Sequence, residues 1–259
     1  MELEGRTALV TGAGSGIGKA SAIRLAEAGA DIAVLSRTAD EVDATAARIE
    51  ALGRRTLRLV ADIADADAMA AAFAEIRDGF GRLDAVFANA GVNGVWAPLR
   101  DLRYDEWNET IAINLGGSFL TFHHAIPLME AAGGSIVITA SINGTRTFTS
   151  AGATAYAVTK AGQVALAQMA ALELARHGIR VNVICPGAIE TRIDENTEPR
   201  NTGAAKVAAV YPEGNIPLTG GTPGTAAEVA DLVLFLASDR SRHITGTPIF
   251  IDGGQSLLV

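Results

Sequence analysis

The chain has 259 residues, of which 49% are hydrophobic and 19% charged, and its net charge is −8. This balance is typical of a globular protein with a sizeable core. The acidic charge, without basic runs, argues against nucleic acid and anionic membranes as partners. The single cysteine, Cys185, excludes an intramolecular disulfide and fits a reducing compartment. Since there is no signal-peptide pattern and no apolar run of membrane-spanning length, a cytoplasmic location is expected.

Short apolar segments alternate with longer Ala-rich amphipathic segments along the chain. The predicted strands are residues 6–11, 31–36, 56–61, 83–88, 135–140, 179–184 and 248–251. The predicted helices are residues 16–28, 39–52, 66–79, about 105–131, 154–177 and 226–238. Most of the strands are almost continuously apolar, which is typical of parallel sheets covered on both faces. The pattern predicts an α/β protein: a single Rossmann-like, doubly wound domain over residues 1–259, with about seven parallel strands in the order 3-2-1-4-5-6-7.

A glycine-rich loop, TGAGSGIG at residues 11–18, follows the first strand and opens the first helix. Glycines let a backbone turn sharply and approach a pyrophosphate, and a helix N-terminus offers unpaired N–H groups and a positive dipole end. The spacing departs from G-x-G-x-x-G, and a tight turn without a ligand is the alternative interpretation. The dinucleotide contacts predicted here are Gly12, Gly14, Ser15, Gly16, Ile17 and Gly18.

The ends of the second and third strands bear on the choice of dinucleotide. Ser36 stands where an NAD site usually has an acidic residue, and Arg37 follows it. Because a guanidinium can hold a 2′-phosphate, the sequence favours NADP(H) over NAD(H), unless Arg37 is solvated and stacks on the adenine. Asp62, with Ile63 beside it, either accepts a hydrogen bond from the adenine amino group or serves as a cap near the next helix.

Three residues further along suggest proton-transfer chemistry. Ser141 lies at the end of a predicted strand, and Tyr156 and Lys160 share one helix face at spacing i, i+4. An ammonium near a phenol lowers the tyrosine pKa, which suits a proton donor or acceptor near neutral pH. The Ser141 hydroxyl can hydrogen-bond the reacting oxygen. Because such Tyr–Lys pairs also occur by chance, the prediction depends on the order of glycine loop, serine and YxxxK.

This order resembles the short-chain dehydrogenase/reductase family, and the resemblance extends over essentially the whole chain. The glycine loop is similar to the family's TGxxxGxG segment, and Ala88-Asn89-Ala90-Gly91 is similar to NNAG with the first Asn replaced by Ala. Asn114 matches the family's active-site asparagine. Pro186, Gly187 and Thr191 match its PG-x-x-x-T segment, which holds the nicotinamide end of the cofactor.

The resemblance implies an NAD(P)(H)-dependent oxidoreductase that interconverts a secondary alcohol and a ketone. Tyr156 would exchange the proton with the substrate oxygen, which Ser141 orients. Lys160 would bond the nicotinamide ribose and lower the tyrosine pKa, and Asn114 would support a water that links Lys160 to solvent. The further cofactor contacts implied are Asn89, Ala90, Gly91, Tyr156, Lys160, Pro186, Gly187, Ile189 and Thr191. A cofactor-binding sensor or scaffold without turnover, and an isomerase that uses the cofactor transiently, are the alternatives.

The substrate side is the least patterned part of the chain. Residues 186–224 are rich in Gly, Pro, Thr and Asn, which predicts a lid or substrate-binding loop, or a partly disordered insertion. The stretch between Ser141 and Tyr156 exceeds the family's usual length. It therefore places Asn143, Arg146 and Phe148 near the substrate, or it is a surface loop without contacts. The resemblance places most substrate contacts in residues 92–100, 142–155 and 186–224, whose Gly, Thr, Asn and aliphatic content favours a small or medium neutral substrate such as a sugar, polyol or keto ester. Arg192 and Arg200 are expected on a solvated loop face, with contact to an anionic substrate as the alternative.

Two further expectations concern metals and assembly. His123 and His124 have no recognisable third ligand, so no metal site is predicted, and Trp96 is expected to pack rather than bind. The family resemblance implies a homotetramer of D2 symmetry, with a dimer second, through helices 105–131 and 154–177. The apolar C-terminal tail either builds a second interface or covers its own core.

Overall fold

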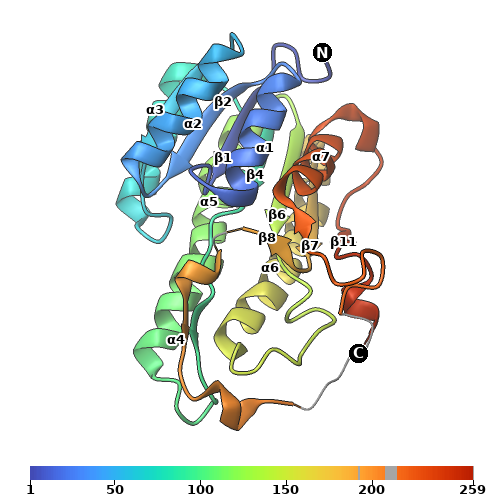
Figure 1. Ribbon diagram of the computed structural model, residues 1–259. Coiled ribbons are helices and arrows are strands. Elements are labelled where there is room, and N and C mark those ends of the chain that lie inside the picture. The colour runs from blue at the N-terminus through green and yellow to red at the C-terminus, as the bar shows by residue number, and fades with distance from the viewer. Residues whose placement is uncertain (192, 208–214, 259) are drawn as a thin grey trace.

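Seven parallel strands form the central sheet of the computed structural model, which describes residues 1–191, 193–207 and 215–258 (Figure 1). In spatial order they are β11 (Pro248–Ile251), β7 (Ile179–Pro186), β6 (Gly134–Thr139), β4 (Ala85–Ala88), β1 (Thr7–Thr11), β2 (Asp31–Ser36) and β3 (Thr56–Val60). All neighbouring pairs are parallel. The predicted Rossmann-like α/β class and strand order are thus confirmed. The numbering reaches 11 because short strands outside this sheet are counted: β5 (Gly94–Trp96), β8 (Ile189–Glu190), β9 (Thr197–Pro199) and β10 (Gly224–Thr225).

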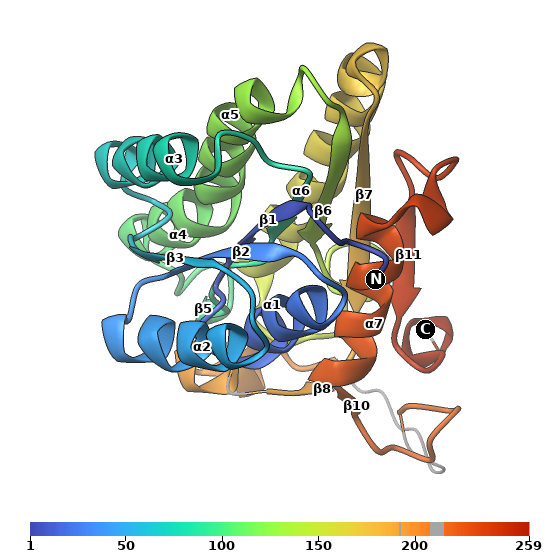
Figure 2. The ribbon, with the colours of Figure 1, turned by 90° about the horizontal axis from the view of Figure 1, so that it is seen from above.

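Helices cover both faces of the sheet, as the view along the layers in Figure 2 shows. On one face pack α1 (Gly16–Glu27), α2 (Ala39–Ala51) and α7 (Ala226–Ala237). On the other face pack α3 (Ala66–Phe80), α5 (Gly117–Met129) and α6 (Thr154–Leu174). Each face has its own hydrophobic cluster, so the sheet is buried on both sides. In the described part of the chain, no helix is long and apolar enough to cross a membrane.

Strand β1 shows why the sequence of these strands is nearly continuously apolar. All five of its residues are buried. Leu9 packs into the cluster of α3 and α5, whereas its neighbours Ala8 and Val10 pack into the cluster of α1 and α2. Because side chains alternate between the faces of a strand, a sheet covered on both sides needs apolar residues at consecutive positions.

The helix predicted at residues 105–131 is interrupted in the structure. It consists of α4 (Tyr104–Ile111), a π-helical turn at Ala112–Gly116 and then α5. A π-helical turn inserts one residue into an α-helix and is frequent at functional sites. Here it contains Asn114, and the change of helix type could not be read from the periodicity.

The carboxyl end of the sheet is the place where this fold can hold a ligand. The strand order reverses at β1, since β2 lies on one side of it and β4 on the other. In open α/β sheets, the loops on the two sides of such a reversal diverge and leave a crevice. The loops after β1, β4, β6 and β7 all contribute residues to one cleft at this end.

Candidate active site

The glycine loop turns tightly against the segment that follows β4. Gly12 has a φ of 67°, in the left-handed region that favours glycine. A Cβ atom on Gly18 would lie 2.1 Å from the Gly12 carbonyl oxygen, so only glycine allows this approach. The Thr11 hydroxyl accepts hydrogen bonds from the backbone N–H groups of Asn89, at 3.0 Å, and Ala90, at 3.1 Å. These bonds join the loop to the end of β4.

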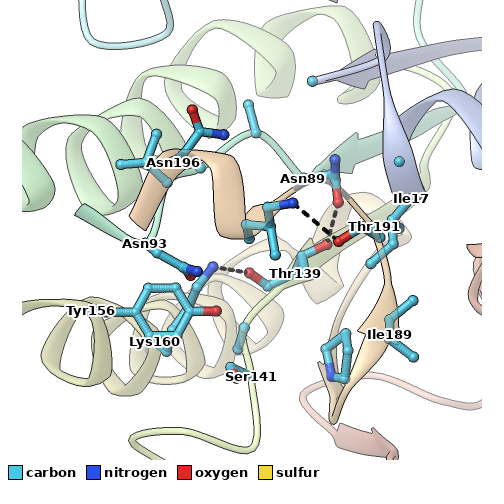
Figure 3. Close-up of a pocket in the computed structure, with 18 of the residues that line it drawn as sticks. Ile17, Asn89, Asn93, Thr139, Ser141, Tyr156, Lys160, Ile189, Thr191 and Asn196 are labelled. Carbon is cyan, nitrogen blue, oxygen red and sulfur yellow. Dashed lines mark hydrogen bonds between the residues drawn. The ribbon is translucent and has the colours of Figure 1, made fainter. Parts of the chain in front are cut away.

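The cleft at the carboxyl end of the sheet has a volume of about 880 Å³ (Figure 3). It is lined by the following predicted site residues: Gly12, Ser15, Gly16, Ile17, Ser36, Arg37, Asp62, Ile63, Asn89, Ala90, Gly91, Ser141, Tyr156, Lys160, Pro186, Gly187, Ile189 and Thr191. Gly14, Gly18 and Asn114 do not line it. Gly18 packs on Gly12, Gly14 lies beneath the Glu41 side chain, and Asn114 is fully buried. Most of the predicted site residues therefore lie on the cleft wall, but more than half of the residues that form this wall were not among them.

Tyr156, Lys160 and Ser141 lie close together in the cleft (Figure 3). The first turns of α6 carry Tyr156 and Lys160, which are 8% and 3% exposed, and the end of β6 leads to Ser141. The Lys160 ammonium donates a hydrogen bond of 2.9 Å to the Thr139 carbonyl oxygen and lies 5.3 Å from the centre of the Tyr156 ring. The Ser141 hydroxyl oxygen accepts a hydrogen bond of 3.1 Å from the Asn143 backbone N–H.

Burial dominates the acid–base properties of this pair. It raises the pKa of Tyr156 to about 12, opposed by a hydrogen bond with Ser141. It lowers the pKa of Lys160 to about 8. In the chain by itself the net shift of the tyrosine pKa is therefore upward, opposite to the predicted direction, because desolvation outweighs the opposing effects. The physical reason is that Tyr156 is desolvated, whereas the Lys160 ammonium is directed to the Thr139 carbonyl.

Asn114 forms the support behind Lys160. Its side-chain oxygen accepts from the Val92 N–H at 2.8 Å, and its side-chain nitrogen donates to the Val92 carbonyl at 2.9 Å and to the Thr159 hydroxyl at 3.1 Å. A Cβ atom on Gly91 would lie 2.9 Å from the Asn114 side-chain oxygen and 3.8 Å from the Lys160 nitrogen. Asn114 thus fixes the segment after β4 against α6, beside Lys160.

The corner of the cleft beyond β2 contains both a cation and carboxylates. The Arg37 side chain is 65% exposed and approaches Asp62 only to 3.9 Å. Asp62 accepts from the Ala64 N–H at 2.9 Å, so it stabilises a local turn while it also lines the cleft. The N-cap of α3 is Asp65. Glu41 of α2, which sequence analysis did not select, lines the same corner.

The predicted substrate loop is anchored to the rest of the chain. Strand β9 of this loop pairs in parallel with β5, and the Asn93 amide donates to the Thr197 hydroxyl at 2.7 Å. The Arg200 guanidinium donates to the buried Glu106 carboxylate at 2.6 and 2.7 Å. The expected solvated position of Arg200 is therefore wrong, because this ion pair binds it to α4. Arg192 and residues 208–214 lie outside the described residues.

The loop before α6 places only one of three predicted substrate contacts in the cleft. Asn143 lines the cleft. The Arg146 guanidinium instead stacks 3.5 Å from the centre of the Phe250 ring, and Phe148 is 73% exposed. Neither of them lines the cleft. A cation–π contact with Phe250 of β11 thus takes Arg146 away from the site.

Other residues of the cleft were not selected from the sequence. Besides Glu41, they include Asn93, Trp96, Thr149, Ser150 and Asn196. The Trp96 ring centre lies 6.4 Å from that of Tyr156 and Trp96 also lines the cleft, while the expectation that Trp96 packs rather than binds stays a prediction. The available signal was position, since Thr149, Ser150 and Asn196 lie in segments expected near the substrate and Asn93 and Trp96 closely follow the A-N-A-G segment.

No metal site is apparent in the described ranges, where no three His, Cys, Asp or Glu residues are grouped to hold an ion. His123 and His124 belong to an aromatic cluster on α5. Their ring centres are 4.9 Å apart, and His124 lies 5.4 Å from Phe73. Burial lowers the pKa of His124.

The cleft fits a nicotinamide adenine dinucleotide. The glycine loop packs closely on the segment after β4, since a Cβ atom on Gly12 would lie 3.0 Å from the Ala90 Cα. The N-terminus of α1 opens on the cleft through Ser15, Gly16 and Ile17. Backbone N–H groups at this position bind phosphates in many proteins.

Comparisons with known proteins agree with this geometry. A family model described as "Enoyl-(Acyl carrier protein) reductase" matches residues 12–256. A 3beta-hydroxysteroid dehydrogenase of Mediterraneibacter gnavus is 36% identical over 95% of this chain and 93% of its own length. The crystal structure of a 3-ketoacyl-ACP reductase from Sinorhizobium meliloti superposes with a TM-score of 0.94 at 50% identity, covering 98% of this chain and all of that one. Carveol dehydrogenase from Mycobacterium avium, in complex with NAD, gives 0.86 at 30% identity over 99% of both chains.

These matches cover nearly the whole chain and agree with the sheet order and the cleft described above. The chain belongs to the short-chain dehydrogenase/reductase family, and it is an oxidoreductase of that family.

Proposed function

We propose that the chain is an NAD(P)(H)-dependent oxidoreductase that interconverts a secondary alcohol and a ketone, with Tyr156 as the general acid and base. The grouping of Tyr156, Ser141 and Lys160 in one cleft with the glycine loop carries this proposal. The relatives support it by their names, since the steroid and carveol enzymes are called dehydrogenases and the acyl-carrier enzyme a reductase.

The cleft residues have distinct tasks in this reaction. The nicotinamide, when bound, supplies or accepts the hydride. During reduction, the Tyr156 phenol donates its proton to the substrate oxygen as that oxygen gains negative charge. The Ser141 hydroxyl donates a second hydrogen bond to the substrate oxygen. The Asn143 N–H orients this hydroxyl by donating a hydrogen bond to the Ser141 Oγ atom. The Lys160 cation stabilises the phenolate that remains.

Asn114 is proposed as a positioning residue. Its side chain is bonded to both backbone groups of Val92 and to Thr159, which supports a role in holding the wall beside Lys160. A water linking Lys160 to solvent would be supported there, so that the proton given up by Tyr156 can be replaced.

The substitution Tyr156→Phe tests this function. It should reduce the turnover of ketones by a factor on the order of 10² to 10⁴, because it removes the acid, while dinucleotide affinity stays within about twofold. Turnover is followed by absorbance of the reduced nicotinamide, and affinity by fluorescence titration. Tyr104→Phe, on the exposed first turn of α4, is the control and should keep full activity. Retained activity in the Tyr156 variant would refute the proposed mechanism.

The alternatives from the sequence are addressed by the same assay. Tight dinucleotide binding without turnover across a broad ketone panel would favour a sensor or scaffold. The complete set of Asn114, Ser141, Tyr156 and Lys160 argues against that alternative. Interconversion of isomers without net change in the cofactor would favour an isomerase.

The substrate is proposed to be neutral and of small to medium size. The wall of the cleft that contains Tyr156 carries several uncharged polar side chains, which are those of Asn93, Asn143, Ser150 and Asn196. Such a wall supports a polar, uncharged compound such as a sugar, polyol or keto ester. Residues 186–224 are proposed as its binding loop, because the described part of this segment contributes Ile189, Glu190 and Asn196 to the cleft.

The form of the cofactor depends on the corner beyond β2. Arg37, on which the NADP(H) prediction rests, is largely exposed and near Asp62. Arg37 supplies one positive charge for binding a 2′-phosphate, but the same corner of the cleft also contains acidic side chains, which repel a phosphate. We therefore propose NAD(P)(H) for the activity, with NADP(H) as the form that Arg37 favours.

A D2 homotetramer remains the proposed assembly, with a dimer second. The exposed face of α6 supports it, since Val158, Met169 and Leu172 are apolar and accessible there. On α5, Phe119 is likewise exposed. A cytoplasmic location stays a prediction from the sequence.

A further inference from the structure

A tryptophan side chain lies beside the proposed acid in the cleft. Trp96, the last residue of β5, is half-buried and lines the cleft together with Tyr156. The centres of the two rings are 6.4 Å apart, and their planes are inclined by 44°. Aromatic rings at this separation are in contact. The two rings therefore form one apolar surface, called here the aromatic corner, and the Tyr156 hydroxyl is hydrogen-bonded with Ser141.

The indole ring of Trp96 is held in its orientation by the segment that precedes it. Its Nε1–H donates a hydrogen bond of 3.2 Å to the Asn93 carbonyl oxygen. The Asn93 side-chain amide donates in turn to the Thr197 hydroxyl at 2.7 Å. The polar edge of the indole is thus used within the protein, and the rest of the ring is hydrocarbon. What Trp96 offers to a ligand is therefore an apolar surface and not a hydrogen-bond donor.

The backbone of Trp96 is fixed from two sides. Its carbonyl oxygen accepts from the Arg200 N–H of the substrate loop at 2.8 Å, and the next N–H, that of Ala97, donates to the Gly152 carbonyl oxygen at 3.1 Å. A Cβ atom on Gly152 would lie 2.7 Å from the Ala97 nitrogen, so the loop before α6 packs directly on this segment. Because the ring is already ordered, little conformational entropy is lost when a ligand covers it.

Uncharged polar side chains accompany the aromatic corner on the cleft wall. They include Asn143, Ser150 and Asn196. The Ser150 hydroxyl donates to the Asn143 side-chain oxygen at 2.8 Å, so these two groups are connected in the wall. Amide and hydroxyl groups of this kind pair with neutral donors and acceptors of a ligand. The combination suits a compact hydrocarbon body that carries hydroxyl or carbonyl groups.

A ring-shaped substrate uses this corner better than an open chain. The reacting carbon must lie next to the Tyr156 hydroxyl, so the atoms bonded to it lie against the aromatic corner. A small saturated ring presents a broad, rigid surface that makes many dispersion contacts with an indole. An open chain with the same number of carbons must fix several rotatable bonds to do so, and this ordering reduces its affinity.

We propose that Trp96 is a specificity-determining residue that selects uncharged cyclic alcohols and ketones, in which the reacting carbon belongs to the ring. In reduction the ring carbon accepts the hydride of the nicotinamide and its oxygen accepts the Tyr156 proton. The inference rests on the proposed function, because it names the substrate class of the same site. It restricts the candidate sugars, polyols and keto esters to cyclic compounds, and it differs from the expectation that Trp96 packs rather than binds.

The test compares neutral ketones in pairs of equal carbon number, such as cyclohexanone with 2-hexanone and cyclooctanone with 2-octanone. For the wild type, kcat/KM should favour the ring member of each pair by at least about tenfold, which is the scale of one well-packed ring contact. Trp96→Leu keeps an apolar side chain but removes the ring, and it should reduce this ratio to within about threefold. Trp96→Phe keeps an aromatic face and should retain more of the ratio than Trp96→Leu.

Trp107→Leu is the matched control and also provides a readout without turnover. Trp107 is half-buried on α4 and does not line the cleft, so its loss should leave the ratio within about twofold of wild type. The chain has two tryptophans, and the emission of this variant therefore comes from Trp96 alone. With oxidised dinucleotide bound, a ketone cannot react. The ring ketone should then change this emission saturably, at about tenfold lower concentration than its open-chain partner.

Thermal unfolding of each variant checks that the fold is retained. Equal losses for both members of each pair in Trp96→Leu would show that Trp96 only supports Tyr156, and would overturn the inference. A wild type without a preference for the ring member would do the same.

The inference and the proposed function fail in different ways. If Tyr156→Phe loses turnover but Trp96→Leu keeps the ring preference, the role of Trp96 is wrong and the oxidoreductase stands. If Trp96→Leu loses the preference but Tyr156→Phe keeps its turnover, the specificity role stands and the catalytic mechanism is wrong. If the wild type neither binds nor reduces any of these ring ketones, the inference is wrong, and the broad ketone panel decides the proposed function separately.

Discussion

Lys160 is an ionisable group buried in a site that needs its charge. Burial lowers its pKa to about 8, and its hydrogen bond to the Thr139 carbonyl holds it in place. Tyr156 is buried as well, and its pKa is raised to about 12. Across the neutral and mildly alkaline range, therefore, Tyr156 remains a protonated acid while Lys160 loses its proton.

The pH dependence of ketone reduction follows from these two values. As the pH rises through about 8, Lys160 becomes neutral and no longer stabilises the phenolate that forms on Tyr156. We expect kcat/KM for a neutral ketone to fall over this range, because this parameter reports the ionisations of the free enzyme. Tyr156 should not contribute to this fall, since its pKa lies near 12. A profile that is flat or rising between about pH 7 and 10 would contradict the assigned role of Lys160.

At the level of single residues, the sequence predicted chemistry better than environment. Ser141, Tyr156 and Lys160 were predicted by type and order, and all three line the cleft. The direction of the tyrosine pKa shift was missed, because desolvation depends on neighbours that are distant in the chain. Glu41 was missed for a similar reason, since its contact with the Gly14 position exists only after α2 has packed beside the glycine loop.

At the level of elements, a buried ion pair connects the substrate loop with α4. The Glu106 carboxylate is held by Arg200 at 2.6 Å and by Arg103 at 2.8 Å. The hydrogen bond from Arg200 is the main reason why the pKa of Glu106 falls to about 2. The Arg200 backbone N–H also donates to the Trp96 carbonyl at 2.8 Å, which places β9 beside the cleft wall.

Glu106→Gln should loosen this connection. It removes the buried carboxylate charge that holds Arg200 and Arg103, so that only weaker hydrogen bonds of a neutral amide can connect the loop with α4. We expect KM for the substrate to rise severalfold while the dissociation constant of the dinucleotide stays within about twofold, since the substitution affects only the substrate side. Steady-state kinetics and fluorescence titration measure the two quantities.

Glu109→Gln, at an exposed position of the same helix, is the control for this substitution. It removes an equal charge without touching the loop and should leave KM unchanged. Equal effects of the two variants would indicate a general electrostatic influence and not a mechanical connection.

At the level of the whole molecule, the exposed apolar face of α6 is the basis for the proposed association between copies of the chain. Met169 and Leu172 are 71% and 82% exposed in the single chain. Apolar side chains gathered on one helix face in this way are typical of contact surfaces. Helix α6 also carries Tyr156 and Lys160, so an interface on it would stabilise the element that holds the site.

Met169→Glu tests this assembly. A charge buried without a partner at an interface is unfavourable, so the variant should dissociate to smaller species. Light scattering after size-exclusion chromatography should give about four times the 26.7 kDa chain mass for the wild type, and less for the variant. Ala70→Glu, on the exposed face of α3, is the control and should keep the wild-type mass. A single-chain mass for the wild type would contradict the proposed tetramer.

The sequence by itself determined the class of the fold and the strand order, and it predicted the residues proposed for the chemistry, because each leaves a local pattern. Buried strands such as β1 are apolar at consecutive positions, and the glycine loop and the Tyr–Lys pair are defined by short spacings. The tertiary structure decided the burial, the pKa values and the interaction partners of these residues. Burial sets the pKa values of Tyr156 and Lys160, Glu106 fixes Arg200, and α2 places Glu41 over the glycine loop. Desolvation and the pairing of charges depend on residues that only folding brings together, so no local pattern could reveal them.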